Sequence, residues 1–211
     1  PTSTDTHKGI VYLDPTDLSK TCNASNSVST TGKKTGCMKW YIYSEDDNSY
    51  NMILDHNTTA NVAYNSTLSN TEMKEVKTAL DSDTSTWDKS LNARLITANE
   101  VAKITGNTSF DEKTSTHAKW FYLDSNNQKQ VANSTNKSKY AWLYDYTKLC
   151  EEYGCNKEAS SPEGYWTSTP VAGETEYVWK VIRKGSLYRD TTSALGIGLR
   201  PVITVLKNVI K

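Results

Sequence analysis

Few side chains in this chain of 211 residues could catalyse a reaction. The three histidines are His7, His56 and His117, and no two of them have metal-ligand spacing such as HExxH. Asp55 precedes His56 at the end of an expected strand, so the two could act as a general base and the residue that orients it. Adjacent residues of a strand point to opposite faces, however, which argues against this pair and favours a structural or surface His56. Because G-x-S-x-G, P-loop and G-x-G-x-x-G motifs are also missing from the sequence, we expect a protein that is not an enzyme and uses no cofactor.

Metal ligands are not predicted either. The acidic stretch Asp46-Asp47-Asn48 could suggest calcium, but no D-x-D-x-D-G loop surrounds it, and a solvated turn is the better interpretation. Neither cysteine pair has C-x-x-C spacing or a nearby histidine, so zinc is a poor interpretation.

The four cysteines form two close pairs, Cys22 with Cys37 and Cys150 with Cys155. We predict a disulfide within each pair, and the first would stabilise a polar loop by about 3 kcal/mol. Disulfides persist outside the cytosol, so we expect an extracellular protein. The alternative is four buried free thiols in a cytosolic protein.

Composition limits the partners. Lys+Arg and Asp+Glu both number 24, which removes the usual electrostatic argument for binding nucleic acid or an anionic membrane. The 13 Tyr and 6 Trp residues provide a core built on aromatic side chains. Since no hydrophobic run approaches about 18 residues, we expect this segment to make no membrane contact. Residues 1–8 resemble a tether from which an N-terminal anchor has been removed, and residues 9–211 are expected to form one domain.

Strands and helices are predicted from apolar and capping patterns. A first strand is expected at 9–13, and a hairpin joins strands at 38–43 and 50–54. Capping boxes at Ser69–Glu72 and Thr97–Glu100 each predict a helix. Further elements are a strand at 119–123, a helix at 140–153, and strands at 165–168, 177–184 and 199–206. Residues 186–198 have weak apolar periodicity and are expected to form a long loop or irregular ribbon.

Three motifs carry a resemblance to known domains. The residues Arg183-Lys184-Gly185-Ser186-Leu187 and Gly198-Leu199-Arg200 are similar to the ending R-G-G-S-W … G-F-R. Gly164-Tyr165-Trp166-Thr167-Ser168-Thr169 resembles Y-W-S-S-T, and the stretch from Arg94 to Glu100 resembles R-L-P-T-x-x-E with Ile96 in place of Pro. These motifs belong to C-type-lectin-like domains of the formylglycine-generating-enzyme family and of the variable proteins of diversity-generating retroelements.

The resemblance implies an α+β, C-type-lectin-like fold with mixed twisted sheets, two short helices and long loops. No cysteine follows Cys155, so the oxidase activity of the formylglycine-generating enzymes is not expected. The calcium-binding motifs of sugar-binding lectins, E-P-N or Q-P-D with W-N-D, are missing as well.

The chain has only four arginines, and those that lie on the motifs are interpreted as structural. Arg189 matches no motif and is expected to be free for a partner. The residues expected to be structural are Arg94, Arg183, Arg200, Trp166 and Trp179.

The predicted function is that of an extracellular, non-enzymatic adhesin or receptor-binding domain on a bacterial surface. The ligand would be a protein or glycan on another cell or surface. In the retroelement proteins the ligand surface lies on the ribbon between the two halves of the ending, and the chain could itself be such a diversified protein. The corresponding ribbon residues are Leu187, Tyr188, Arg189, Asp190, Thr191 and Thr192, together with Lys180 and Ile182 on the neighbouring strand. The alternatives are a solvated loop at this position and a structural role as the globular head of a pilin-like subunit.

Overall fold

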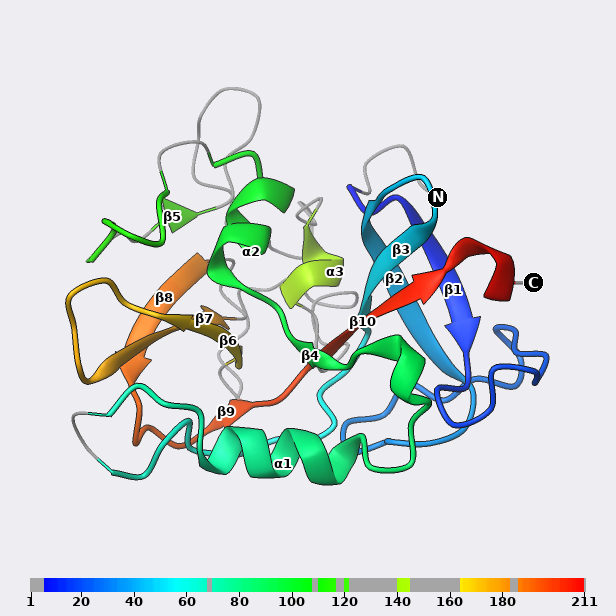
Figure 1. The fold of residues 1–211 in the computed structure, drawn as a ribbon, viewed down its shortest axis with the longest axis horizontal. Coiled ribbons are helices and arrows are strands. Elements are labelled where there is room, and N and C mark those ends of the chain that lie inside the picture. Colours follow the sequence, from blue (N-terminus) through cyan, green and yellow to red (C-terminus); the bar gives the residue numbers. More distant parts are fainter. Residues whose placement is uncertain are drawn as a thin grey trace, which may run out of the picture.

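The computed structural model describes residues 6–67, 70–107, 110–116, 120–121, 140–144, 164–182 and 186–210. Within them the chain forms two mixed or antiparallel five-stranded sheets with helices between and beside them, an α+β architecture (Figure 1). Cys150, Cys155 and Arg183 lie outside these residues, so the second disulfide and the role of Arg183 stay predictions.

Strands from both ends of the chain form the first sheet. Its order is β1 (Gly9–Leu13), β2 (Met38–Glu45), β3 (Ser49–Leu54), β10 (Pro201–Leu206) and β4 (Arg94–Leu95). The predicted hairpin is confirmed, and its turn is closed by the Asp46 carboxylate, which accepts from the backbone N–H of Ser49 at 2.7 Å. The predicted central position of the last strand is also confirmed, because β10 lies between β3 and β4.

The second sheet has the order β5 (Trp120–Phe121), β8 (Ser186–Thr191), β7 (Tyr177–Ile182), β6 (Gly164–Pro170) and β9 (Ile197–Gly198). The expectation of an irregular ribbon after residue 185 was wrong, because residues 186–191 form a regular strand. β8 pairs with β7 along its whole length, from Tyr177 opposite Thr191 to Ile182 opposite Ser186. β8 is defined by its hydrogen bonds to a neighbouring strand, and these bonds cannot be recognised from the apolar periodicity of the segment itself.

Two α-helices lie along the chain between β3 and β5. In α2 (Ala98–Ile104) the predicted capping box is confirmed, since Thr97 Oγ1 accepts from Glu100 N–H at 3.0 Å and the Glu100 carboxylate accepts from Thr97 N–H at 2.8 Å. The helix predicted after Ser69–Glu72 is present as α1 (Glu75–Asp83), but that capping box was wrong. The helix begins at Glu75, five residues later than a cap at residue 69 predicts, and Lys74 before it provides no side-chain cap.

Shorter helical turns are α3 (Ala141–Tyr144), η1 (Lys89–Leu91) and η2 (Lys207–Val209).

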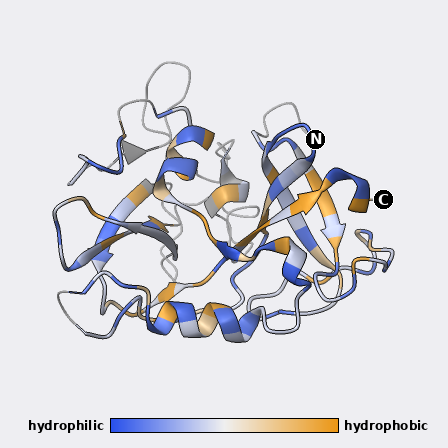
Figure 2. Ribbon diagram, viewed as in Figure 1, coloured by the Kyte–Doolittle hydropathy of each residue, from blue (hydrophilic) through white to orange (hydrophobic). Residues whose placement is uncertain are grey.

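Three apolar clusters fill the interior. One lies between the sheets and α2 and includes Tyr165 and Trp179, a second packs on the first sheet around Trp40, and a third includes Trp166 and side chains of α1. Trp166 and Trp179 are fully buried, which is the placement expected for structural residues. Both faces of β10 are covered, and Figure 2 shows the strand as apolar along most of its length.

The disulfide between Cys22 and Cys37 is confirmed, with 5.4 Å between the two Cα atoms. It closes residues 23–36, here called the disulfide loop. A disulfide is typical of proteins in an oxidising compartment. Among the described residues, no helix is long and apolar enough to cross a membrane.

Residues 6–8, expected in the tether, lie against the first sheet. Thr6 Oγ1 accepts from Trp142 Nε1–H at 2.9 Å, and the His7 ring lies 5.3 Å from that of Tyr41. These residues therefore belong to the folded part of the chain.

Candidate binding surface on strands β7 and β8

The residues predicted to contact a ligand divide between the two faces of the β7–β8 pair, because side chains alternate along a strand. Leu187, Arg189 and Thr191 pair with Val181, Trp179 and Tyr177, so they lie on the face that packs into the interior. The opposite face carries Lys180, Ile182, Tyr188 and Asp190, which we call the Lys180 face, and also Val178, which is fully buried in the third cluster. Lys180 and Tyr188 are directly opposite each other in the register.

Leu187 and Thr192 were wrongly predicted to contact a ligand. The Leu187 side chain is fully buried in the same cluster as Val181 and Trp179. Thr192 is also buried, with its N–H donating to Glu176 O at 2.8 Å and its carbonyl accepting from Asn65 N–H at 2.9 Å. A partner cannot reach either side chain.

Arg189 is engaged within the protein, contrary to the expectation that it is free for a partner. Its guanidinium carbon lies 4.2 Å from the centre of the Tyr177 ring. Nη1 is 3.4 Å from Glu174 Oε1. The half-buried arginine therefore joins β8 to β7 and to the turn before it.

Lys180 is a buried cation whose charge is balanced by Asp190. The Lys180 side chain is 3% exposed, and its Nζ donates to Asp190 Oδ2 at 2.5 Å. Asp190 Oδ1 accepts from the N–H of Thr191 at 2.8 Å, so both carboxylate oxygens have a partner. The carboxylate is nevertheless 31% exposed. Lys180 is thus too deeply buried to form a contact surface itself, and it holds Asp190 in place beside Tyr188.

Arg200 has the surroundings of a structural arginine. It is fully buried and donates to three backbone carbonyls, those of Leu54, Leu143 and Trp142. The Tyr165 ring lies 5.2 Å from its guanidinium carbon. Burial raises the pKa of Tyr165 to about 12, although the neighbouring cation acts in the opposite direction.

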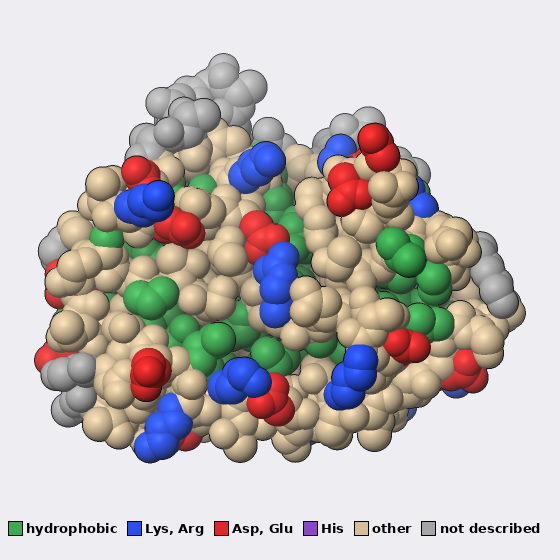
Figure 3. Space-filling model, viewed as in Figure 1, with side chains coloured by type: hydrophobic (Ala, Val, Ile, Leu, Met, Phe, Trp, Pro, Cys, Tyr) green, Lys and Arg blue, Asp and Glu red, His purple; other side chains and the backbone are tan. Residues whose placement is uncertain are grey.

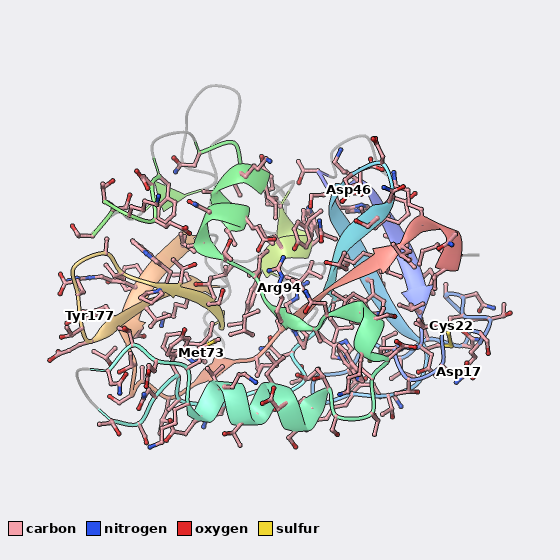
Figure 4. The ribbon with its side chains drawn as sticks, viewed as in Figure 1. Asp17, Cys22, Asp46, Met73, Arg94 and Tyr177 are labelled. Carbon is pink, nitrogen blue, oxygen red and sulfur yellow. A yellow bond between two sulfur atoms is a disulfide. The ribbon has the colours of Figure 1, made fainter. Side chains whose placement is uncertain are left out.

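Arg94 holds the start of α2. Its Nη1 and Nη2 bind the two oxygens of Glu100 at 2.8 and 2.6 Å, a bidentate pair that lysine cannot reproduce. Tyr43 O–H donates to the same carboxylate at 2.9 Å. Burial alone would raise the pKa of Glu100, but the hydrogen bonds from Arg94 and Thr97 outweigh it and hold the pKa below its usual value. Figure 4 shows Arg94 near the middle of the molecule, where β4 approaches α2.

A hollow of about 490 Å³ lies between α2 and the β2–β3 hairpin, visible on the surface in Figure 3. Tyr43 and Glu100 line it together with Lys8, Glu45 and Lys103. One motif in the sequence, from Arg94 to Glu100, contributes a residue to the lining of this hollow, namely Glu100. The oxygens of Glu100 are occupied by Arg94, Thr97 and Tyr43, which leaves this carboxylate no evident role as a base.

Asp55 and His56 form the pair that strand alternation argued against. His56 Nδ1 lies 2.6 Å from Asp55 Oδ1, and both side chains are buried. The two residues follow the end of β3 at Leu54, where the backbone bends and strand alternation no longer applies. His56 Nε2 is 2.9 Å from the carbonyl oxygen of Lys33. The imidazole is therefore closed off from any substrate and links two segments of the chain.

Across the described ranges, no group of three or more His, Cys, Asp or Glu side chains could hold a metal ion. The chain matches no protein-family model. A comparison with curated proteins gives no significant match. The same is true of a comparison with solved structures. Any function therefore has to be inferred from the residues of the chain itself.

Proposed function

We propose that this chain is an extracellular, non-enzymatic binding domain with a C-type-lectin-like fold, displayed on a bacterial surface. The arrangement of the elements supports the fold: strands from both ends of the chain share the first sheet, and α1 and α2 precede the strands β6 to β8 of the second. The motif arginines support it as well, since Arg94 and Arg200 make buried or half-buried hydrogen bonds at the junctions of these elements. The disulfide between Cys22 and Cys37 supports a location outside the cytosol.

The proposed binding role rests on one observation, the set of side chains on the Lys180 face. Tyr188 and Asp190 are half-buried on one strand, and a buried lysine on the neighbouring strand fixes the Asp190 carboxylate. Ile182 adds a half-buried apolar side chain to the same face. Rigid aromatic and charged side chains of this kind lose little conformational entropy when they bind a partner.

The partner is a protein or glycan on another cell or surface. The net charge of zero gives no attraction to nucleic acid or to an anionic membrane. The Asp190 carboxylate and the Tyr188 ring suit a ligand that offers hydrogen-bond donors next to an apolar patch.

The test uses the labelled protein on an array of glycans and on an array of extracellular protein domains. Tyr188→Ala and Asp190→Ala should each weaken binding about fivefold or more, the loss expected for an interface anchor. Tyr12→Ala is the matched control, because Tyr12 is a half-buried tyrosine of β1 in the other sheet. Equal binding by the parent, the Tyr188 variant and the Asp190 variant would refute the proposed surface, and a parent that binds neither array would refute the proposed function.

A further inference from the structure

The disulfide loop is held to the rest of the protein by hydrogen bonds from three places. Gly32 N–H donates to Asn57 O at 2.8 Å, and Trp87 Nε1–H donates to Lys34 O at 2.7 Å. Between these two contacts, the carbonyl oxygen of Lys33 lies 2.9 Å from His56 Nε2. His56 is thus central to the attachment of the loop.

Both ring nitrogens of His56 face oxygen atoms. The Lys33 carbonyl can only accept a hydrogen bond, so Nε2 must carry a hydrogen. Nδ1 lies 2.6 Å from Asp55 Oδ1, a distance that requires a second proton between the two atoms. With that proton the buried Asp55–His56 pair has no net charge, whichever of the two residues carries it.

Removal of this proton leaves the imidazole with one hydrogen for two acceptors. If the hydrogen stays on Nε2, the lone pair of Nδ1 faces the Asp55 carboxylate. If it moves to Nδ1, the lone pair of Nε2 faces the Lys33 carbonyl. His56 is 1% exposed, so water does not readily replace the lost contact.

We infer that the proton shared by Asp55 and His56 stabilises the attachment of the disulfide loop to the rest of the protein. Loss of this proton on raising the pH weakens that attachment. The disulfide keeps both ends of the loop in place, so the loosening is local. In Figure 4 Cys22 and Tyr177 lie at opposite ends of the long axis, so the loop is separate from the outer end of the second sheet. The pair therefore makes the surface formed by residues 23–36 dependent on pH.

The other charged groups near this pair are Lys33 and Lys34 of the loop, Lys39 of β2, Asp83 of α1 and the buried Arg200, whose Nε donates to the carbonyl of Leu54, the residue before Asp55. Lys34 and Asp83 form an ion pair with each other. The Lys39 ammonium lies 4.9 Å from the centre of the Tyr41 ring, and its backbone carbonyl accepts from Asp55 N–H at 3.1 Å. Lys34, Lys39 and Asp83 therefore have contacts of their own, Arg200 donates to three backbone carbonyls, and the carboxylate that meets the His56 ring is that of Asp55.

Hydrogen exchange measured by NMR from about pH 5 to about pH 9 tests the inference. The reporters are Gly32 N–H and Trp87 Nε1–H, and the amides of β3 and β10 serve as the reference for the whole fold. In the parent, the protection of the two reporters, corrected for the intrinsic exchange rate, should fall about fivefold or more relative to the reference amides. The fall should coincide with the change in the ¹⁵N signals of the His56 ring.

Asp55→Asn is the decisive variant. The asparagine amide can donate to Nδ1 while Nε2–H still donates to Lys33, so the loop is fastened by a neutral imidazole and its protection should not depend on pH. His56→Gln gives a second variant that keeps a donor near Lys33, has no ionisable group and should behave in the same way. An identical pH profile in the parent and in a folded variant would overturn the inference. The inference would also be overturned if the His56 ring of the parent carried only one proton, and Asp55 were ionised, at the lowest pH at which the protein is folded.

Discussion

Arg200 and Tyr165, both fully buried, donate hydrogen bonds to the same carbonyl oxygen, that of Leu143 in α3. The two donors belong to different parts of the fold, since Tyr165 lies in β6 of the second sheet and Arg200 immediately precedes β10 of the first. One carbonyl group therefore ties α3 to both sheets. Leu54 and Trp142 accept the remaining hydrogen bonds of the arginine, so the position requires a planar group with several donors.

Replacement of Arg200 should consequently destabilise the fold. Arg200→Ala removes one donor from each of three buried carbonyl groups, of which only that of Leu143 keeps the Tyr165 hydroxyl, and should lower the free energy of unfolding by about 3 kcal/mol or more. Arg200→Lys should recover only part of this loss, because one ammonium cannot reach all three acceptors. Urea denaturation followed by tryptophan fluorescence measures the difference.

Arg189→Ala is the matched control for this measurement. Arg189 is half-buried and makes one ion pair at 3.4 Å and one contact with the Tyr177 ring. Its removal should cost about 1 kcal/mol or less. Similar losses for the two alanine variants would show that Arg200 does not have the structural role assigned to it.

The elements that could be predicted from the sequence are those whose signals are local. The β2–β3 hairpin has polar turn residues between two apolar runs, and the α2 capping box needs only Thr97 and Glu100. The capping pattern at Ser69–Glu72 did not mark the start of α1: Asn70 Oδ1 accepts from Glu72 N–H at 2.8 Å before the helix begins, and Ser69 lies outside the described residues. A capping pattern alone is thus not sufficient to locate the first turn of a helix.

The sequence pointed to residues 180–192 as a candidate site but did not show how these residues pair. The motifs pointed to the segment after Arg183, yet the formation of β8 depends on its pairing with β7, which has no local signal. That pairing decides which side chains are accessible: it buries Leu187 and leaves Tyr188 half-buried on the opposite face. The Asp55–His56 pair was missed because strand alternation was applied to two residues that follow the predicted strand end at Leu54, where the backbone bends.

Loss of the Cys22–Cys37 disulfide should destabilise the protein without changing its fold. The cysteines are 15 residues apart, and opening a loop of this length costs about 3 kcal/mol in the chain-entropy model. The variant Cys22→Ser/Cys37→Ser leaves the other cysteines intact and should show this difference in urea denaturation. A loss below about 1 kcal/mol would mean that contacts such as that of His56 already restrict the loop in the unfolded chain.

The stability conferred by Glu100 should depend on pH in a defined direction. Its pKa is lower in the folded state than in the unfolded state, so the contribution is present above the unfolded value and is lost as the pH falls through the folded value. Glu100→Gln keeps the size of the side chain but removes the charge that binds Arg94. The parent should have the higher melting temperature at pH 7, and the gap should narrow below about pH 4. A gap of the same size at acidic and neutral pH would contradict the assigned role of the ion pair.

Gly164 should tolerate no side chain, because β6 and β7 approach each other closely at this point. A Cβ atom at this position would lie 1.9 Å from the carbonyl oxygen of Val181, a backbone atom that cannot move without displacing β7. Gly164→Ala should therefore lower the free energy of unfolding by about 3 kcal/mol or more. Gly9→Ala provides the control in the other sheet, since its Cβ would meet only the flexible end of Ile42 at 3.3 Å and should cost far less. Thermal and urea denaturation of the two variants would test the register of β6 against β7, in which Lys180 lies opposite Trp166. Equal stability of the two variants would mean that β6 and β7 are not paired in this register.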